Sequence, residues 1–155
     1  MQYRVPPGLH HFAGPRAVFV NPAPTTRHCQ YRVKILLCIK GLSGTGGGAE
    51  RAFVDLANGL YRKGHSVCVL SFERSDAVPY YPLDPAIEKL GLDIASPDYP
   101  ISRLAIPGAL LALRRMVGAW GPDVVVAFMH SAYIPVGLAL LGTGTRFVAS
   151  EHTSS

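Results

Sequence analysis

A glycine-rich turn between an apolar run and an amphipathic helical pattern is the feature that most limits how this chain can fold. The apolar run covers Val33–Ile39, and Gly46, Gly47 and Gly48 follow it. From Gly48 to Arg62, apolar residues recur at intervals of three and four, which is the period of one face of a helix. The sequence therefore predicts a strand, a glycine loop and a helix in succession.

The glycine loop has the composition of an anion-binding turn. Glycine lets a ligand approach the backbone closely, and the first turn of a helix offers N–H groups without internal partners at the positive end of its dipole. Such a loop suits a phosphate or a carboxylate. One or two glycines would be enough for a tight turn, so the run Gly46–Gly48 favours a ligand over the alternative of a plain strand-to-helix turn. Glu50 either favours the helix dipole or holds the loop by bonding back to it.

The chain from Val33 onward alternates between strand and helix patterns. Apolar segments typical of parallel strands buried on both faces lie at 67–72, 123–128 and 146–150, and a weaker strand is expected at 92–94. Helical patterns lie at 107–119 and 132–141, and Ser131 is the expected cap of the second. This alternation predicts an α/β fold, a Rossmann-like parallel sheet with helices on both faces.

Charge and composition divide the chain in two. Residues 1–32 carry four arginines and no acidic residue, so most of the formal net charge of +5 lies there. This segment is also rich in proline and has no sustained period, which predicts a disordered basic extension before a folded domain at 33–155. Because the folded part is close to neutral and has no basic stripe, we expect no binding to nucleic acid.

The cysteines and the longest uncharged stretches bear on the cellular location. The 3 cysteines have no metal-type spacing, and Cys38 and Cys68 lie inside apolar strand patterns. We therefore expect a reducing cytoplasm and small buried thiols. The uncharged stretch at 131–145 is short and is broken by Pro135 and three glycines, so we do not expect it to cross a membrane.

Polar residues follow two of the later predicted strands. His130 and Ser131 come directly after the strand at 123–128, and Glu151 and His152 after the one at 146–150. The carboxyl ends of parallel strands meet at one edge, where ligands of open α/β sheets bind. We therefore expect these residues to share a cleft with the glycine loop, although either histidine alone reads more simply as a loop residue. Because neighbours on an extended chain point to opposite faces, one of Glu151 and His152 should face the cleft.

Several short motifs resemble those of a known family. They are Gly-Gly-Gly-Ala-Glu-Arg at 46–51, Asp-Leu-Ala-Asn-Gly-Leu at 55–60, Lys-Gly-His-Ser-Val at 63–67, Pro-Asp-Val-Val-Val at 122–126 and Ser-Glu-His-Thr at 150–153. Together they resemble the amino-terminal domain of family 4 glycosyltransferases over residues 33–155. The resemblance implies one half of a GT-B fold, in which two Rossmann-like domains face each other across a cleft. It also implies transfer of a sugar, with retention, from a nucleotide sugar to a glycan or lipid-linked acceptor.

The resemblance implies roles for individual residues as well. His152 would be the catalytic residue at the reaction centre, and His130, Ser131 and Glu151 would line the acceptor side. The loop Gly46–Gly48, with Glu50, would approach the donor diphosphate. No metal or other cofactor is expected, because the sequence has no Asp-x-Asp cluster.

The sequence departs from the family in its length. The family's carboxy-terminal domain binds the nucleotide sugar through a Glu-x7-Glu motif, and no two glutamates here have that spacing. We therefore expect residues 33–155 to be an incomplete amino-terminal half of a GT-B enzyme, inactive by itself for lack of the donor-binding domain. A cytoplasmic location is expected. Whether the protein also lies peripherally at the inner face of the membrane is left open.

Two other functions stay open at this point. The pattern Gly44-x-Gly46-x-x-Ala49 fits a loose dinucleotide-binding fingerprint, and Glu73 follows the second strand where a ribose-binding acid belongs. An NAD(P)-binding oxidoreductase domain is therefore one alternative, although the segment 40–43 separates the strand from the glycines and the fingerprint normally starts at the strand end. The other alternative is a non-catalytic module that binds an acceptor glycan or a partner chain.

Overall fold

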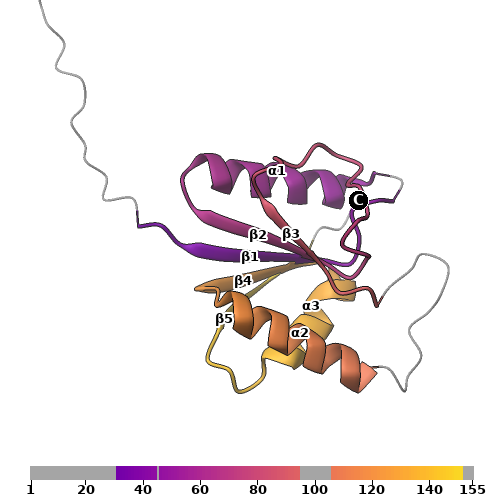
Figure 1. Ribbon diagram of the computed structural model, residues 1–155, viewed down its shortest axis with the longest axis vertical. Coiled ribbons are helices and arrows are strands. Elements are labelled where there is room, and N and C mark those ends of the chain that lie inside the picture. Colours follow the sequence, from indigo (N-terminus) through magenta and orange to yellow (C-terminus); the bar gives the residue numbers. More distant parts are fainter. Residues whose placement is uncertain (1–30, 45, 95–105, 152–155) are drawn as a thin grey trace, which may run out of the picture.

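The computed structural model describes residues 31–44, 46–94 and 106–151. Within these ranges a parallel sheet carries helices on both faces (Figure 1). The elements are, in chain order, β1 (Lys34–Ile39), α1 (Gly48–Arg62), β2 (Ser66–Ser71), β3 (Glu88–Gly91), α2 (Ile106–Trp120), β4 (Val124–Phe128), α3 (His130–Leu140) and β5 (Arg146–Ser150). The Rossmann-like α/β fold predicted from the alternating pattern is confirmed.

The order of the strands places a switch point in the middle of the sheet. The described strands run in the order β3-β2-β1-β4-β5, and every neighbouring pair is parallel. The chain first builds outward from β1 through β2 to β3 and then crosses back, so that β4 pairs with the free side of β1. In open α/β sheets, ligands bind at the carboxyl ends of the strands where the order reverses. Here that place lies between the loop after β1 and the turn after β4.

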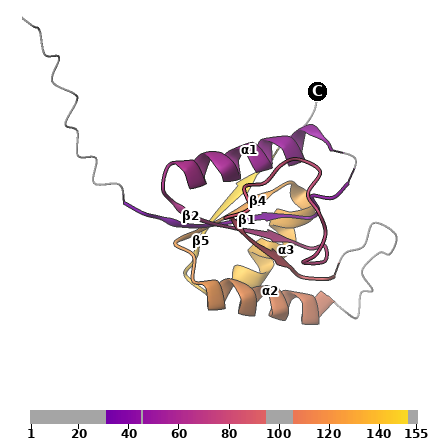
Figure 2. The same ribbon diagram turned by 45° about the horizontal axis from the view of Figure 1, so that its top comes forward.

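Alternate residues of the central strands point to opposite faces and form two separate cores. Leu37 and Val69, both 0% exposed, pack with Phe53 of α1 on one face. Leu36 and Leu70 belong to the cluster on the other face, together with buried residues of α2 and α3. Figure 2 shows α1 on one side of the sheet and α2 with α3 on the opposite side. Burial of both faces explains why residues 35–39 of β1 and 67–70 of β2 are continuous apolar runs.

The third strand differs in position from the sequence-based expectation. It covers Glu88–Gly91 rather than the apolar residues at 92–94. Leu92 and Ile94 do donate backbone hydrogen bonds to the end of β2, at 2.9 and 3.1 Å. Asp93 between them has a φ of 53°, which interrupts the extended conformation and ends the strand.

The two thiols that the structure describes are buried as predicted. Cys38 and Cys68 are free cysteines with 0% exposure. Burial raises the pKa of both thiols, and for Cys68, where the charge of Glu88 also contributes, it reaches about 12. Both side chains therefore act as small apolar residues of the core.

Two further sequence-based expectations concern the amino-terminal extension and membrane-spanning helices. The predicted extension at 1–32 lies almost entirely outside the residues that the structure describes. Among the helices at 48–62, 106–120 and 130–140, none is long and apolar enough to cross a membrane.

Candidate functional site

The loop after β1 has a conformation that requires glycine at its first glycine position. Gly46 has a φ of 71°, in the left-handed region that favours glycine. A Cβ atom at this position would also overlap the ring of Tyr80. From the same side, the Tyr81 hydroxyl donates a hydrogen bond of 2.9 Å to the Gly46 carbonyl. Gly46 therefore has a structural reason to be glycine.

The other two glycines form an exposed entry to α1. Gly47 is the N-cap residue, and no side chain caps the helix by a hydrogen bond. A Cβ on Gly48 would have open space around it, so packing does not explain this glycine. A Cβ on Gly47 would lie 2.5 Å from a carboxylate oxygen of Glu50, so Glu50 folds back over the start of the helix. An anion bound to these N–H groups would require Glu50 to swing aside, because like charges repel.

A strained residue joins β4 to α3. Met129 has φ 65° and ψ 152°, a backbone region that is almost restricted to glycine. Its N–H donates a 2.9 Å hydrogen bond to the Ser150 carbonyl at the end of β5. This sharp turn starts α3 at His130, two residues before the expected start, so Ser131 lies inside the first turn and is not the cap. Strain of this kind is found preferentially at functional sites.

The residue after β5 contacts α3 through a tyrosine that the sequence analysis did not single out. The Glu151 carboxylate acts on the Tyr133 hydroxyl, and its interaction with the protonated hydroxyl is the main cause that raises the pKa of Tyr133. Glu151 thus lies near Tyr133 in the first part of α3, the helix that begins with His130 and Ser131. His152, the predicted catalytic residue, lies outside the described part of the chain.

An apolar pocket opens beside the switch point on the side of α2 and α3. Its volume is about 420 Å³, within the range of small-molecule sites. Of the described residues that line it, Lys40 and Ser131 are polar and the others are apolar, among them Leu110 of α2 and Leu138 of α3. The described lining therefore offers a hydrocarbon environment together with one cation, Lys40. Ser131 is the predicted site residue that contributes to it, whereas His130 is exposed and does not line it.

Glu73, the acid that a dinucleotide-binding site would direct at a ribose, has other partners here. Its side chain is only 8% exposed. Its carboxylate accepts hydrogen bonds from the Leu42 N–H at 2.8 Å, the Ser43 N–H at 3.2 Å and the Ser43 hydroxyl at 2.6 Å. Both oxygens are therefore bound to the loop after β1, and the NAD(P)-binding alternative is not favoured.

Sequence reasoning did not select Lys40, Tyr81 or Tyr133 as site residues. It selected Glu73 only as a ribose-binding acid and not as the acceptor for the loop after β1. Lys40 had a usable signal, because it directly follows β1. The others depend on contacts between segments far apart in the chain, for which a single sequence has no signal. Within the described ranges, no three His, Cys, Asp or Glu side chains gather closely enough to hold a metal ion.

Comparison with protein families gives one match that covers most of the chain. The model of the family described as Glycosyltransferase Family 4 matches residues 46–155. Among curated proteins, the chain is similar to the GalNAc-alpha-(1->4)-GalNAc-alpha-(1->3)-diNAcBac-PP-undecaprenol alpha-1,4-N-acetyl-D-galactosaminyltransferase of Campylobacter jejuni. The two are 29% identical over 109 residues, which are 70% of this chain and 30% of that relative.

Solved structures with a similar fold include MurG, a synthase and a domain of a hydrogenase. MurG of Acinetobacter baumannii is 18% identical with a TM-score of 0.53, over 76% of this chain and 35% of MurG. Sucrose-phosphate synthase of Thermosynechococcus elongatus is 14% identical with a TM-score of 0.56, over 77% of this chain and 33% of the synthase. The C-terminal domain of a Pyrococcus furiosus hydrogenase is 14% identical with a TM-score of 0.54, over 78% of this chain and 92% of that domain. These likenesses show the fold alone, because one fold serves many functions.

Proposed function

Because the chain belongs to glycosyltransferase family 4, we propose that it forms the acceptor-binding side of an enzyme that transfers a sugar from a nucleotide sugar to a lipid-linked acceptor with retention. An acceptor hydroxyl oxygen bonds to the anomeric carbon of the sugar, and the bond from that carbon to the diphosphate breaks. The nucleoside diphosphate leaves, and the hydroxyl proton passes to a base. Developing negative charge on the diphosphate is what the N–H groups at the start of α1 would stabilise.

The observation that carries the choice of a lipid-linked acceptor is the apolar pocket beside Ser131. A hydrocarbon chain gains about 25 cal/mol for each Å² that it buries in such a pocket. A polar glycan would lose its hydrogen bonds to water there without replacement. Lys40, which is one of the lining residues, suits the phosphate of a lipid head group. The name of the C. jejuni relative specifies an undecaprenyl-diphosphate-linked acceptor for that protein.

The outer surface of α2 and α3 supports contact with a membrane. Its exposed large apolar side chains are Ile106, Leu111, Ile134, Leu138 and Leu141, each at least 44% exposed. Arg114 and Arg115 of α2 are exposed as well. Apolar side chains that enter the interface, with cations for anionic head groups, are typical of peripheral membrane binding. We place the protein in the cytoplasm, peripherally at the inner face of the membrane.

The roles of single residues belong to the same proposal. His152 acts at the reaction centre, while His130, Ser131 and Glu151 line the acceptor side. The described loop Gly46–Gly48 approaches the donor diphosphate, and no metal takes part. The donor nucleotide sugar is bound by a second domain, so residues 1–155 alone do not transfer sugar. Turnover of a radiolabelled nucleotide sugar by these residues alone would contradict this last point.

Binding of farnesyl diphosphate tests the lipid-linked acceptor without a complete enzyme. We expect calorimetry to show that the chain binds farnesyl diphosphate more tightly than inorganic pyrophosphate. Leu138→Glu, which places a charge in the pocket, should weaken binding about tenfold, because that factor corresponds to about 1.4 kcal/mol of lost apolar contact and desolvation.

A matched variant separates the pocket from the general apolar surface. Leu111 is 49% exposed and Leu138 52% exposed, but only Leu138 lines the pocket. Leu111→Glu should therefore leave the affinity for farnesyl diphosphate unchanged. Equal losses in both variants, or equal affinity for pyrophosphate and farnesyl diphosphate in the parent chain, would refute the lipid-linked acceptor.

A further inference from the structure

We infer that Glu73 and Tyr81 are positioning residues that set the conformation of the glycine loop. They belong to the segment between β2 and β3, residues 72–87, which we call the β2–β3 segment. The role goes beyond the proposed function in that it concerns how the loop is shaped. Its importance for sugar transfer rests on the proposed function.

The β2–β3 segment contacts the loop at several successive points. The Phe72 N–H donates to the Lys40 carbonyl at 3.1 Å, and the Tyr80 N–H donates to the Leu42 carbonyl at 2.8 Å. Further along the loop, the Tyr81 hydroxyl holds the Gly46 carbonyl at 2.9 Å. Lys40, Leu42 and Gly46 of the loop are therefore held by a segment more than 30 residues away in the chain.

Glu73 makes the strongest of these connections. Three donors of Leu42 and Ser43 converge on its nearly buried carboxylate, at 2.6 to 3.2 Å. Hydrogen bonds to a carboxylate are about twice as strong as those between neutral groups. The carboxylate also needs Gly41, because a Cβ there would lie 2.7 Å from one of its oxygens. The absence of a side chain at position 41 thus makes room for Glu73.

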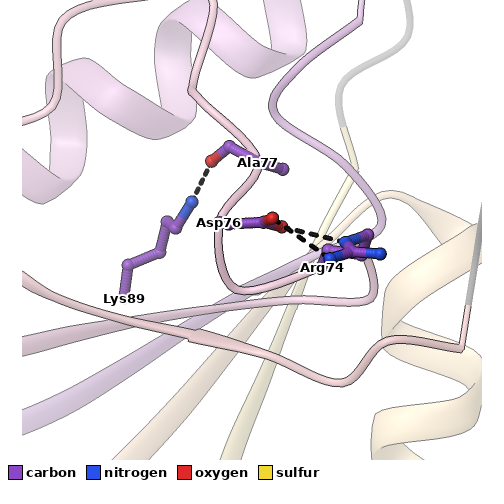
Figure 3. A network of polar contacts seen from close by, with 4 residues as sticks. All are labelled: Arg74, Asp76, Ala77 and Lys89. Carbon is purple, nitrogen blue, oxygen red and sulfur yellow. Dashed lines mark hydrogen bonds and ion pairs between the residues drawn. The ribbon is translucent and has the colours of Figure 1, made fainter.

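The β2–β3 segment is itself braced, so it can act as a fixed support. Figure 3 shows the Arg74 guanidinium paired with the Asp76 carboxylate at 3.0 and 3.2 Å, and the Lys89 ammonium bound to the Ala77 carbonyl. Farther along the segment, Asn58 of α1 donates to the Pro82 carbonyl at 2.9 Å. Its side-chain oxygen also accepts from the Asp84 N–H at 2.9 Å.

The placement of these contacts indicates positioning rather than general stability. They act on main-chain groups of the loop that leads to the exposed N–H groups of Gly47 and Gly48. Fixing such a loop in advance lowers the entropy lost when a ligand binds. Loss of Glu73 or Tyr81 should therefore loosen the loop while the sheet stays intact.

Amide hydrogen exchange followed by NMR tests the inference in the chain itself. In Glu73→Gln, the Leu42 and Ser43 amides should exchange about tenfold faster than in the parent chain, because that factor corresponds to about 1.4 kcal/mol. Core amides of β1 and β2 should keep their protection. Asp55→Asn is the matched control, because it removes an exposed acid of α1 that pairs with Arg51 and lies outside the β2–β3 segment.

Tyr81→Phe is a second variant that keeps the ring and removes one hydrogen bond. It should change the amide shifts of Gly46 and Gly48 and leave Leu42 protected. Tyr80→Phe is its control, because the described residues supply no hydrogen-bond partner for the Tyr80 hydroxyl. Unchanged exchange in Glu73→Gln together with unchanged shifts in Tyr81→Phe would overturn the inference.

Titration with inorganic pyrophosphate separates this inference from the proposed function. The Gly47 and Gly48 amides of the parent chain should shift on titration, with an affinity several-fold weaker in Glu73→Gln and Tyr81→Phe than in their controls. A purely structural role would leave this affinity unchanged in variants that remain folded. If pyrophosphate leaves the parent chain unchanged, the diphosphate part of the proposed function fails, and hydrogen exchange still decides whether Glu73 positions the loop.

Discussion

The backbone of Met129 predicts that glycine is more stabilising than alanine at this position. Its φ of 65° and ψ of 152° lie in a region that costs a residue with a Cβ about 1–3 kcal/mol. Glycine lacks the Cβ but loses about 0.5–1 kcal/mol through its greater freedom in the unfolded chain. Met129→Gly and Met129→Ala both remove the rest of the side chain, so their difference isolates the backbone term. We expect Met129→Gly to be more stable than Met129→Ala by about 1 kcal/mol, which is the strain removed less the entropy that glycine loses.

Urea unfolding of the two variants measures this difference directly. For a domain of this size, about 1 kcal/mol corresponds to a shift of about 2–4 °C in Tm, so thermal melts give an independent check. Position 118 is the control, because Gly118 lies inside α2 with open space around it. There alanine should be the more stable residue by about 0.5–1 kcal/mol.

The relative stability of the two variants decides whether the backbone of Met129 is strained. If alanine at position 129 is as stable as glycine or more so, the turn between β4 and α3 carries no backbone strain. If glycine is the more stable, the native Met129 is kept against a stability cost at the residue before His130. Such a cost is expected where the direction of a helix start matters for function.

Two further predictions concern the glycine loop and the buried thiols. Gly46→Ala should lower the free energy of unfolding by about 2 kcal/mol, because of the positive φ and the overlap with Tyr80. Gly48→Ala should raise the free energy of unfolding by about 0.5–1 kcal/mol. Urea unfolding that ranks the two variants in the opposite order would contradict this. The raised pKa of Cys38 and Cys68 means that the folded chain keeps both protons above pH 9.0, the ordinary value, while the unfolded chain loses them. Their contribution to stability is therefore complete below pH 9 and lost as the pH rises toward the folded values, by about 1 kcal/mol for each thiol between pH 9 and pH 10. Cys68→Ala should show a correspondingly smaller loss of stability over this interval, and an unchanged pH slope would argue against the burial of this thiol.

The sheet was predictable from sequence because of how its strands are buried. Parallel strands covered on both faces are continuous apolar runs, and β1, β2 and β4 have that pattern. β3 is an outer strand of the described sheet, and its residues Glu88 and Lys89 do not form an apolar run. The strand was therefore predicted at the nearby apolar residues Leu92 and Ile94. The positive φ of Asp93, which lies between Leu92 and Ile94, is a property of the folded backbone that the sequence does not reveal.

The strand ends around the candidate site were predictable, whereas its details were not. The ends of β1 and β4 lie side by side because β1 and β4 pair, and that one cleft joins the glycine loop to the residues after β4 stays a prediction. The start of α3 was wrong by two residues, because a serine was expected to cap a helix whose N-cap is Met129. The partners of Glu73 could not be foreseen, since its hydrogen bonds reach 30 and 31 residues back along the chain. The roles of His130, Glu151 and His152 stay predictions.

The separation of the two cores has a consequence for how such a scaffold can diversify. The glycine loop rests on α1 and the β2–β3 segment, whereas most of the apolar pocket is built from α2 and α3 on the other face of the sheet. Substitutions that reshape the pocket therefore arise mostly in a different packing unit from those that hold the loop. The shape of the pocket can change while the loop is inherited unchanged.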